Sequence, residues 1–192
     1  MVSRHTERMP EVKIYVAFLR GINVGGKNLL PMKELVALCS DAGCLQVRSY
    51  IQSGNVIFRA SPGLAARLPG VIGAQIEKRF GHKPPLVLRT QEQLAHVFAN
   101  NPFLETGSPQ EMLHVMFLAD APTPAAVNAL DPNRSPPDTY IVSGPHIYLR
   151  LPNGMGKSKL TNAFFDSKLA TVSTARNWRT IGNLLELMQQ AS

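Results

Sequence analysis

A glycine-rich stretch near the N-terminus, residues 20–28, carries residue types suited to holding an anion. It reads Arg-Gly-Ile-Asn-Val-Gly-Gly-Lys-Asn and lies between an apolar run and a stretch typical of a helix. Backbone N–H groups in such a loop, with a helix start behind them, form a phosphate site. We predict that Arg20 and Lys27 supply charge there. Gly25 and Gly26 would let the backbone approach the ligand, and Asn23 would donate a hydrogen bond.

A predicted hairpin turn is expected beside this loop. Residues 46–51 and 55–59 read as two strands joined at Ser53-Gly54. In a strand-helix-strand-strand-helix-strand unit, this turn and the exit of the first strand lie at the same end. Gln52, Ser53 and Asn55 should therefore lie near residues 20–28, with Gln52 as a further donor.

Basic residues also gather at three predicted helix starts. Lys27 and Lys33 flank the first helix, a second helix is predicted from Ser158, and a third from about residue 175. A cation at a helix N-terminus is unfavourable by about 0.3–1 kcal/mol, so we expect a bound anion there. The alternative is a carboxylate of the protein itself, with Glu34, Asp41 and Asp166 as candidates. The last two helices are expected to be antiparallel, which argues against one site shared by all three starts. The full predicted ligand-binding set is Arg20, Asn23, Gly25, Gly26, Lys27, Asn28, Gln52, Ser53, Asn55, Lys157, Ser158, Lys159, Arg176, Asn177 and Arg179.

Other chemistries have weaker signals. Residues 21–27 approach Walker A spacing, but Asn28 stands where a serine or threonine should hold magnesium, and residues 154–158 have Leu151 at the first glycine position. No histidine spacing suits a metal, and no serine lies in a nucleophile elbow. We therefore predict no metal and no cofactor, interpret His114 and His146 as structural, and leave open both the catalytic residues and whether the chain is an enzyme.

Composition indicates a globular protein with acidic partners. The 192 residues are 44% apolar and 17% charged, with net charge +7. This charge favours nucleotide or nucleic acid, although it also serves solubility. The start of the chain is polar, without a secretory h-region, and no apolar run is long enough for a membrane span. We expect a cytoplasmic protein without a membrane partner, in which Cys39 and Cys44 are buried reduced thiols. The oligomeric state is open.

The predicted elements alternate in a recognisable order. Strand 13–19, a helix from Pro31, the hairpin 46–59, a helix from 61 to 80 interrupted at Pro69, and strand 85–89 form a ferredoxin-like pattern. A helix from Thr90, strand 112–118, helix 123–130, hairpin 140–149 and helices 158–169 and 175–189 follow. The stretch Tyr-Ile-Gln-Ser-Gly at 50–54 aligns with Tyr-Ile-Val-Ser-Gly at 140–144, and Ile57 with Ile147, a weak repeat. We predict an α+β, tandem ferredoxin-like fold with two extra C-terminal helices. Its parts are a flexible tail (1–11), a first half (12–89) and a second, related half (90–192).

Five short motifs together point to a family. Residues 19–26, 50–56, 101–103, 158–160 and 176–180 resemble the bacterial family catalogued as domain of unknown function 1697. The resemblance implies tandem ferredoxin-like halves and no established activity. Residues 173–175 read Ser-Thr-Ala where relatives more often run through two threonines, which leaves open the cap of the last helix.

The leading functional hypothesis is binding of a phosphate-bearing ligand, nucleotide or nucleic acid, at residues 20–28. Two alternatives stay open. One is an enzyme acting on a small anionic metabolite, which predicts a closed pocket with a perturbed titratable group. The other is a protein-interaction module in which the glycine loop serves shape alone.

Overall fold

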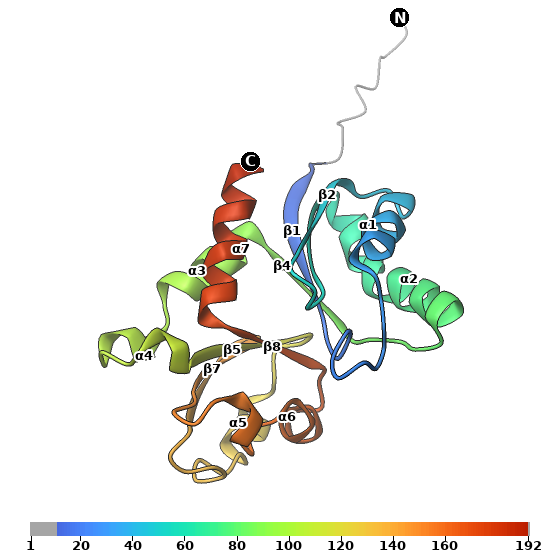
Figure 1. Ribbon diagram of the computed structural model, residues 1–192. Helices are drawn as coiled ribbons and strands as arrows, with labels where there is room; N and C mark the ends of the chain where they lie inside the picture. The colour runs from blue at the N-terminus through green and yellow to red at the C-terminus, as the bar shows by residue number, and fades with distance from the viewer. Residues whose placement is uncertain (1–10, 192) are drawn as a thin grey trace, which may run out of the picture.

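Two four-stranded antiparallel sheets organise the protein, a mixed α/β structure that a computed structural model describes over residues 11–191 (Figure 1). Residues 1–10 of the predicted tail (1–11) lie outside this range. The first sheet has the order β2-β3-β1-β4 and the second the order β6-β7-β5-β8. Their strands are β1 (Lys13–Leu19), β2 (Leu45–Tyr50), β3 (Asn55–Ala60), β4 (Leu86–Thr90), β5 (Leu113–Leu118), β6 (Thr139–Ser143), β7 (His146–Arg150) and β8 (Ser173–Asn177).

The helices form an outer layer on each sheet and a pair between the sheets (Figure 1). Helices α1 (Met32–Asp41) and α2 (Pro62–Phe80) cover the first sheet, and α5 (Pro124–Asn128) and α6 (Asn162–Leu169) cover the second. Helices α3 (Gln91–Ala99) and α7 (Trp178–Gln190) pack on each other between the sheets. The short α4 (Pro102–Glu105) and the 3₁₀ turns η1 (Gln110–Met112) and η2 (Met155–Lys157) complete the chain. No helix in the described range is long and apolar enough to cross a membrane.

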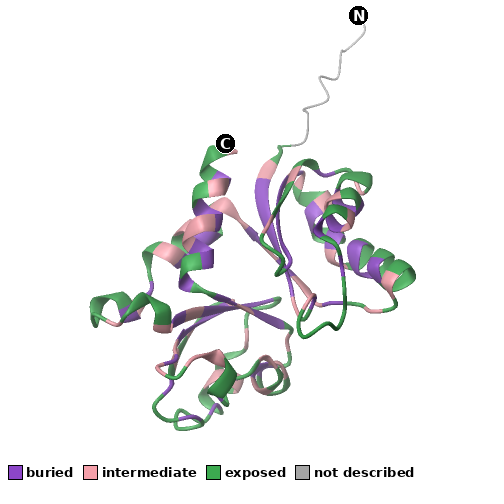
Figure 2. Ribbon diagram, in the orientation of Figure 1, coloured by how far each residue is buried: buried purple, intermediate pink, exposed green. Residues whose placement is uncertain are grey.

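The central core joins the two sheets, and buried residues run continuously from one sheet into the other (Figure 2). Phe18 of β1 stacks on Phe117 of β5 with ring centroids 4.5 Å apart. Trp178 is buried and stacks on Phe98, so its side chain belongs to the core. Because both sheets bury a face here, they are held as one body.

Local signals in the sequence account for several boundaries. The Thr90 side chain accepts from Gln93 N and the Gln93 side chain accepts from Thr90 N, which forms a capping box at the predicted start of α3. Cys39 and Cys44 are free and buried as predicted, and burial raises their pKa values to about 12 and about 11.

The predicted break at Pro69 is wrong, because α2 runs unbroken from Pro62 to Phe80. A proline inside a helix removes one backbone hydrogen bond. Leu68 and Ile72 on either side of Pro69 are fully buried against the first sheet. These apolar contacts stabilise the helix where the backbone hydrogen bond is missing.

The prediction for the C-terminal region is wrong in two places. The helix expected from Ser158 begins only after Thr161, whose side chain caps Phe164 N. Residues 175–177, predicted as the start of the last helix, belong to the strand β8 (Ser173–Asn177), so α6 lies between two strands and is not an extra helix. Residues 173–177 show no apolar alternation, and only pairing with β5 makes them a strand.

The predicted alignment of the two hairpins is also wrong, because their turns differ in length and the strand pairing is shifted. Tyr50 pairs with Asn55 across the first hairpin, and Ser143 pairs with His146 across the second, so the turns contain four and two residues. Tyr50 therefore corresponds to Ser143 and not to Tyr140. Ile57 faces the central core, whereas Ile147, its supposed counterpart, faces the outer core.

Candidate functional site

The tip of the glycine loop is a tight turn. Lys27 N donates to Val24 O at 3.0 Å, and the intervening Gly25 and Gly26 have φ values of 57° and 72°. Two successive residues with positive φ are the requirement of a type I′ turn, which glycine meets without strain. The four residues are exposed. The turn alone therefore explains both glycines.

The amides of this loop hold its own backbone. Asn23 Nδ2 donates to Leu30 O at 2.9 Å and to Gln52 O at 3.0 Å, and Asn28 Nδ2 donates to Gly21 O at 2.9 Å. The expected closeness of the 52–55 turn to the loop is confirmed by the Asn23–Gln52 bond. The Asn23 and Asn28 side chains are therefore engaged within the protein, whereas Gln52, the other predicted donor, is exposed and contributes only its backbone carbonyl.

Arg20 has a carboxylate partner, as the alternative hypothesis proposed. Its Nη1 lies 2.6 Å from Asp166 Oδ2 and also donates to Ser173 O at 2.8 Å. Ser173 Oγ donates to the other Asp166 oxygen. This network links the first half of the chain to the second and neutralises the charge of Arg20.

The remaining predicted residues are dispersed. Lys157 ends η2, Lys159 is exposed, and Ser158 Oγ accepts from Leu160 N, so no helix starts there. Asn177 caps α7 by accepting from Thr180 N at 2.8 Å, which settles the capping residue that the sequence left open. With Arg179, Asn177 lines a cavity of about 460 Å³ that also includes His114.

Arg176 lies on β8 and not in a helix, and it has a counterpart that the sequence analysis did not identify. Arg176 pairs with Val115 in the second sheet, just as Arg89 pairs with Val16 in the first. The Arg176 guanidinium lies 5.2 Å from the Phe18 ring centre, and that of Arg89 lies 5.4 Å from the Phe117 ring centre. Each arginine thus reaches from its own half onto the stacked phenylalanine of the other.

The Arg176 site is closed. A guanidinium has five N–H donors, and Arg176 uses all five within the described chain. Their acceptors are Asn55 Oδ1, Thr174 Oγ1 and the carbonyls of Ala175, Leu19 and Ser53, at 2.6 to 3.1 Å. Tyr50, whose backbone pairs with Asn55, accepts from Asn183 Nδ2 at its hydroxyl at 2.5 Å.

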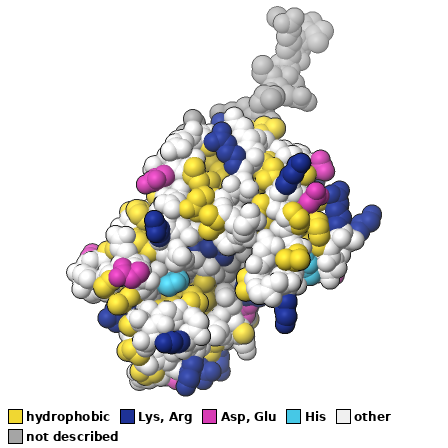
Figure 3. All heavy atoms as spheres, viewed as in Figure 1, with side chains coloured by type: hydrophobic (Ala, Val, Ile, Leu, Met, Phe, Trp, Pro, Cys, Tyr) yellow, Lys and Arg dark blue, Asp and Glu magenta, His cyan; other side chains and the backbone are white. Residues whose placement is uncertain are grey.

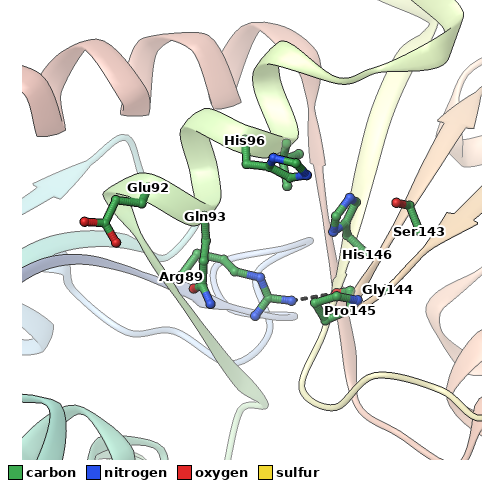
Figure 4. A pocket seen from close by; sticks show the side chains of 9 residues that line it. Arg89, Glu92, Gln93, His96, Ser143, Gly144, Pro145 and His146 are labelled. Carbon is green, nitrogen blue, oxygen red and sulfur yellow. Dashed lines mark hydrogen bonds between the residues drawn. The ribbon is translucent and has the colours of Figure 1, made fainter.

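The Arg89 site is open. Its side chain donates to three carbonyls, Leu88 O, Leu118 O and Pro145 O, at 2.6 to 2.7 Å, and its Nε has no hydrogen-bond partner among residues 11–191. Arg89 is only 6% exposed, yet it lines a cavity of about 420 Å³ between α3 and the β6–β7 turn (Figure 4). Glu92 also lines this cavity, but its carboxylate points away from the guanidinium.

Substitutions at equivalent positions explain the cavity. Ser143 stands where the first half has Tyr50. Counted from the two equivalent arginines, His96 holds the position in α3 that Asn183 holds in α7, and His96 faces the cavity. A serine cannot fill the space of a tyrosine ring. His146 replaces Asn55, so no side-chain oxygen reaches the guanidinium Nε from that position.

The electrostatics of this cavity favour an anion. In residues 11–191 no carboxylate lies within 4 Å of the Arg89 guanidinium. Burial lowers the Arg89 pKa to about 10, which leaves it charged at neutral pH. Burial, followed by the nearby Arg89 and His96, lowers the His146 pKa to about 4, which leaves it neutral. A buried cation without a counter-ion is costly, and an anionic ligand would offset that cost.

Sequence reasoning missed Arg89, His96 and Ser143 and assigned His146 a purely structural role. The one available signal was a charged residue at an inward-facing position of an otherwise apolar strand, Leu-Val-Leu-Arg at 86–89. Within residues 11–191, no group of three or more His, Cys, Asp or Glu side chains is placed to hold a metal ion.

Comparisons with known proteins agree with this architecture. The chain is similar in structure to the conserved bacterial protein SP0830 from Streptococcus pneumoniae, with a TM-score of 0.66 and 21% sequence identity. The match covers 93% of this chain and 99% of that one. At this identity the likeness concerns the fold alone. No curated protein matches the sequence.

The sequence profile described as "Protein of unknown function (DUF1697)" matches residues 12–148, a range that includes Arg89, His96 and His146. The profile covers well over half of the chain. The chain therefore belongs to the DUF1697 family, as the five motifs indicated.

Proposed function

We propose that this protein binds a small ligand with a phosphate or carboxylate group in the cavity lined by Arg89, His96 and His146. The observation that carries the proposal is a buried arginine with an unused Nε donor on a cavity wall and no carboxylate beside it. Charge-assisted bonds from a guanidinium to an oxyanion are among the strongest hydrogen bonds in proteins. The cavity, about 420 Å³, is within the usual range for a small-molecule site.

The Arg176 site supports this choice by contrast. The same side chain at the equivalent position is supplied with five protein acceptors. Protein groups thus satisfy one arginine completely and leave the other facing a cavity. A ligand oxygen is the partner that the Arg89 site lacks.

A direct test is titration of the protein with inorganic phosphate, followed by two-dimensional NMR of the backbone amides. We expect shifts centred on residues 89–97 and 143–146. Arg89→Gln should weaken binding at least tenfold, whereas Lys27→Ala, in the glycine loop, should leave it unchanged. If Lys27→Ala weakens binding and Arg89→Gln does not, the binding site lies in the glycine loop and not in the cavity.

Binding of a nucleotide or nucleic acid at residues 20–28 is the second candidate. It is favoured by the N-terminus of α1, which has no side-chain cap, and by the exposed Lys27 and Lys33 close to it in sequence. On the face shown in Figure 3, however, lysines and arginines lie apart from one another over both halves. Contact with many phosphates would give a steep loss of affinity with salt. Weak salt dependence would favour the small-ligand cavity.

We also propose that both halves are ferredoxin-like units and that the protein is cytoplasmic. In support of the first, each half has the order strand-helix-strand-strand-helix-strand, and the sheet orders β2-β3-β1-β4 and β6-β7-β5-β8 correspond strand for strand. In support of the second, both cysteines are unpaired thiols.

A further inference from the structure

The cavity presents a hydrogen-bond acceptor beside its arginine. We propose that its ligand is an oxyanion that carries its own O–H or N–H donor, and that this donor binds Nδ1 of His146 while the anionic oxygen binds Arg89. The inference rests on the proposed function and specifies the ligand of that same site.

A chain of hydrogen bonds fixes the tautomer of His146. The Tyr148 hydroxyl lies 3.1 Å from Val97 O, and a carbonyl can only accept, so the hydroxyl proton points to Val97. The Tyr148 oxygen must then accept from His146 Nε2, which lies 3.2 Å away. A neutral imidazole carries one proton. With that proton on Nε2, Nδ1 is left as a bare acceptor.

The surroundings of His146 keep it in this state. Its ring faces Arg89 and His96 across the cavity and Tyr148 along its own strand, with the Glu92 carboxylate turned away. Two cationic or basic neighbours oppose a second proton on the ring, and burial lowers the His146 pKa to about 4. At neutral pH, Nδ1 therefore accepts and does not donate.

An acceptor in this position discriminates between anions. Phosphate near neutral pH retains an O–H donor, whereas sulfate has none and would place an oxygen lone pair against the nitrogen lone pair. Glycolate and acetate form the same kind of pair among carboxylates, because only glycolate carries a hydroxyl. A site built to hydrogen-bond a ligand hydroxyl rejects the analogue that lacks it.

The test measures affinity for both pairs at pH 7.5 by NMR or calorimetric titration of the full chain. For the wild type we expect phosphate to bind at least tenfold tighter than sulfate, or glycolate at least tenfold tighter than acetate. The pair that shows the larger effect identifies the class. His146→Phe should reduce this ratio to near one, and His146→Gln, which keeps an acceptor, should restore part of it. The matched control His114→Phe, on a histidine outside this cavity, should leave the ratio unchanged.

Different failures have different meanings. If the anions bind through Arg89 but the wild type shows ratios below two in both pairs, the donor requirement is wrong and the proposed function stands. If no anion binds in an Arg89-dependent manner, the proposed function itself is wrong. Should His146→Phe not fold, the two wild-type ratios decide the question alone.

Discussion

Two buried arginines occupy equivalent places in the two halves, and their surroundings differ in a way that matches a structural role for Arg176 and the proposed binding role for Arg89. Arg176 has a protein acceptor for each of its five donors. Arg89 has three carbonyl partners and faces a cavity. The buried charge is therefore common to both halves, and only the cavity beside Arg89 distinguishes the proposed ligand site.

The largest expected effect is on stability. Arg176→Met should lower the free energy of unfolding by about 4 kcal/mol, because several buried acceptors lose their donor at about 1–3 kcal/mol each. Arg89→Met, which frees only three carbonyls, should cost about half as much. Urea denaturation measures both. If Arg176→Met does not fold, Arg176→Lys replaces it; equal losses at the two positions would remove the distinction between them.

Of the two equivalent positions, only His146 at the open site should make the free energy of unfolding depend on pH. The His146 pKa falls from its usual 6.5 to about 4 on folding, so the unfolded chain binds more protons between these values. Stability from this group is therefore complete above pH 6.5 and declines as pH falls toward 4, by about 3 kcal/mol. The equivalent Asn55 does not titrate.

Unfolding of wild type and His146→Phe across this range measures the effect. The variant should lose the part of the decline that His146 contributes, while the part from His114, whose pKa burial also lowers, should remain. An identical pH profile for the two proteins would show that His146 is not held neutral by its surroundings.

Filling the cavity should convert the open site toward the closed one. Ser143→Tyr places the ring of Tyr50 at the equivalent position, and we expect it to weaken phosphate binding at least tenfold, or about 1.4 kcal/mol. Ser143→Ala, which leaves the space empty, is the matched control and should bind as the wild type does.

The reverse change, Tyr50→Ser, empties space beside Arg176. It should create no phosphate site, because all five donors of Arg176 remain engaged. New binding in Tyr50→Ser would show that space alone, without unused donors, is sufficient.

The smallest expected effect concerns the ion pair that joins the halves on the closed side. Arg20 and Asp166 are 2.6 Å apart, with side chains 29% and 19% exposed. A double-mutant cycle with Arg20→Met and Asp166→Asn should give a coupling energy of about 1 kcal/mol, because the pair is only partly screened by solvent. A coupling near zero would assign Arg20 to the solvated surface and reopen it as a ligand-binding residue.

Local patterns predicted most of the first half and the hairpins of both halves. Strand β1 begins and ends at the predicted residues, because an apolar run bounded by polar residues needs no further information. The capping box of α3 is equally local. Strand β8 has no such pattern, since its inward residues are Thr174 and Arg176, which are buried through partners far away in sequence.

The predicted site was less successful for the same reason. The glycine and basic residues at 20–28 form a local motif that predicts a ligand site. A type I′ turn and the Asp166 partner of Arg20 account for much of that motif. Whether a basic side chain is free depends on residues more than a hundred positions distant.

Residues close together in the chain were enough to predict the family, most strands and helices, and the burial of the two cysteines. That Arg89 and Arg176 are counterparts, and that one is enclosed while the other borders a cavity, became clear only from the folded protein. Their hydrogen-bond partners and the space beside them depend on packing between the halves. The presence of Ser143 at the strand end where the first half has Tyr50 can be interpreted only when both sheets are in place.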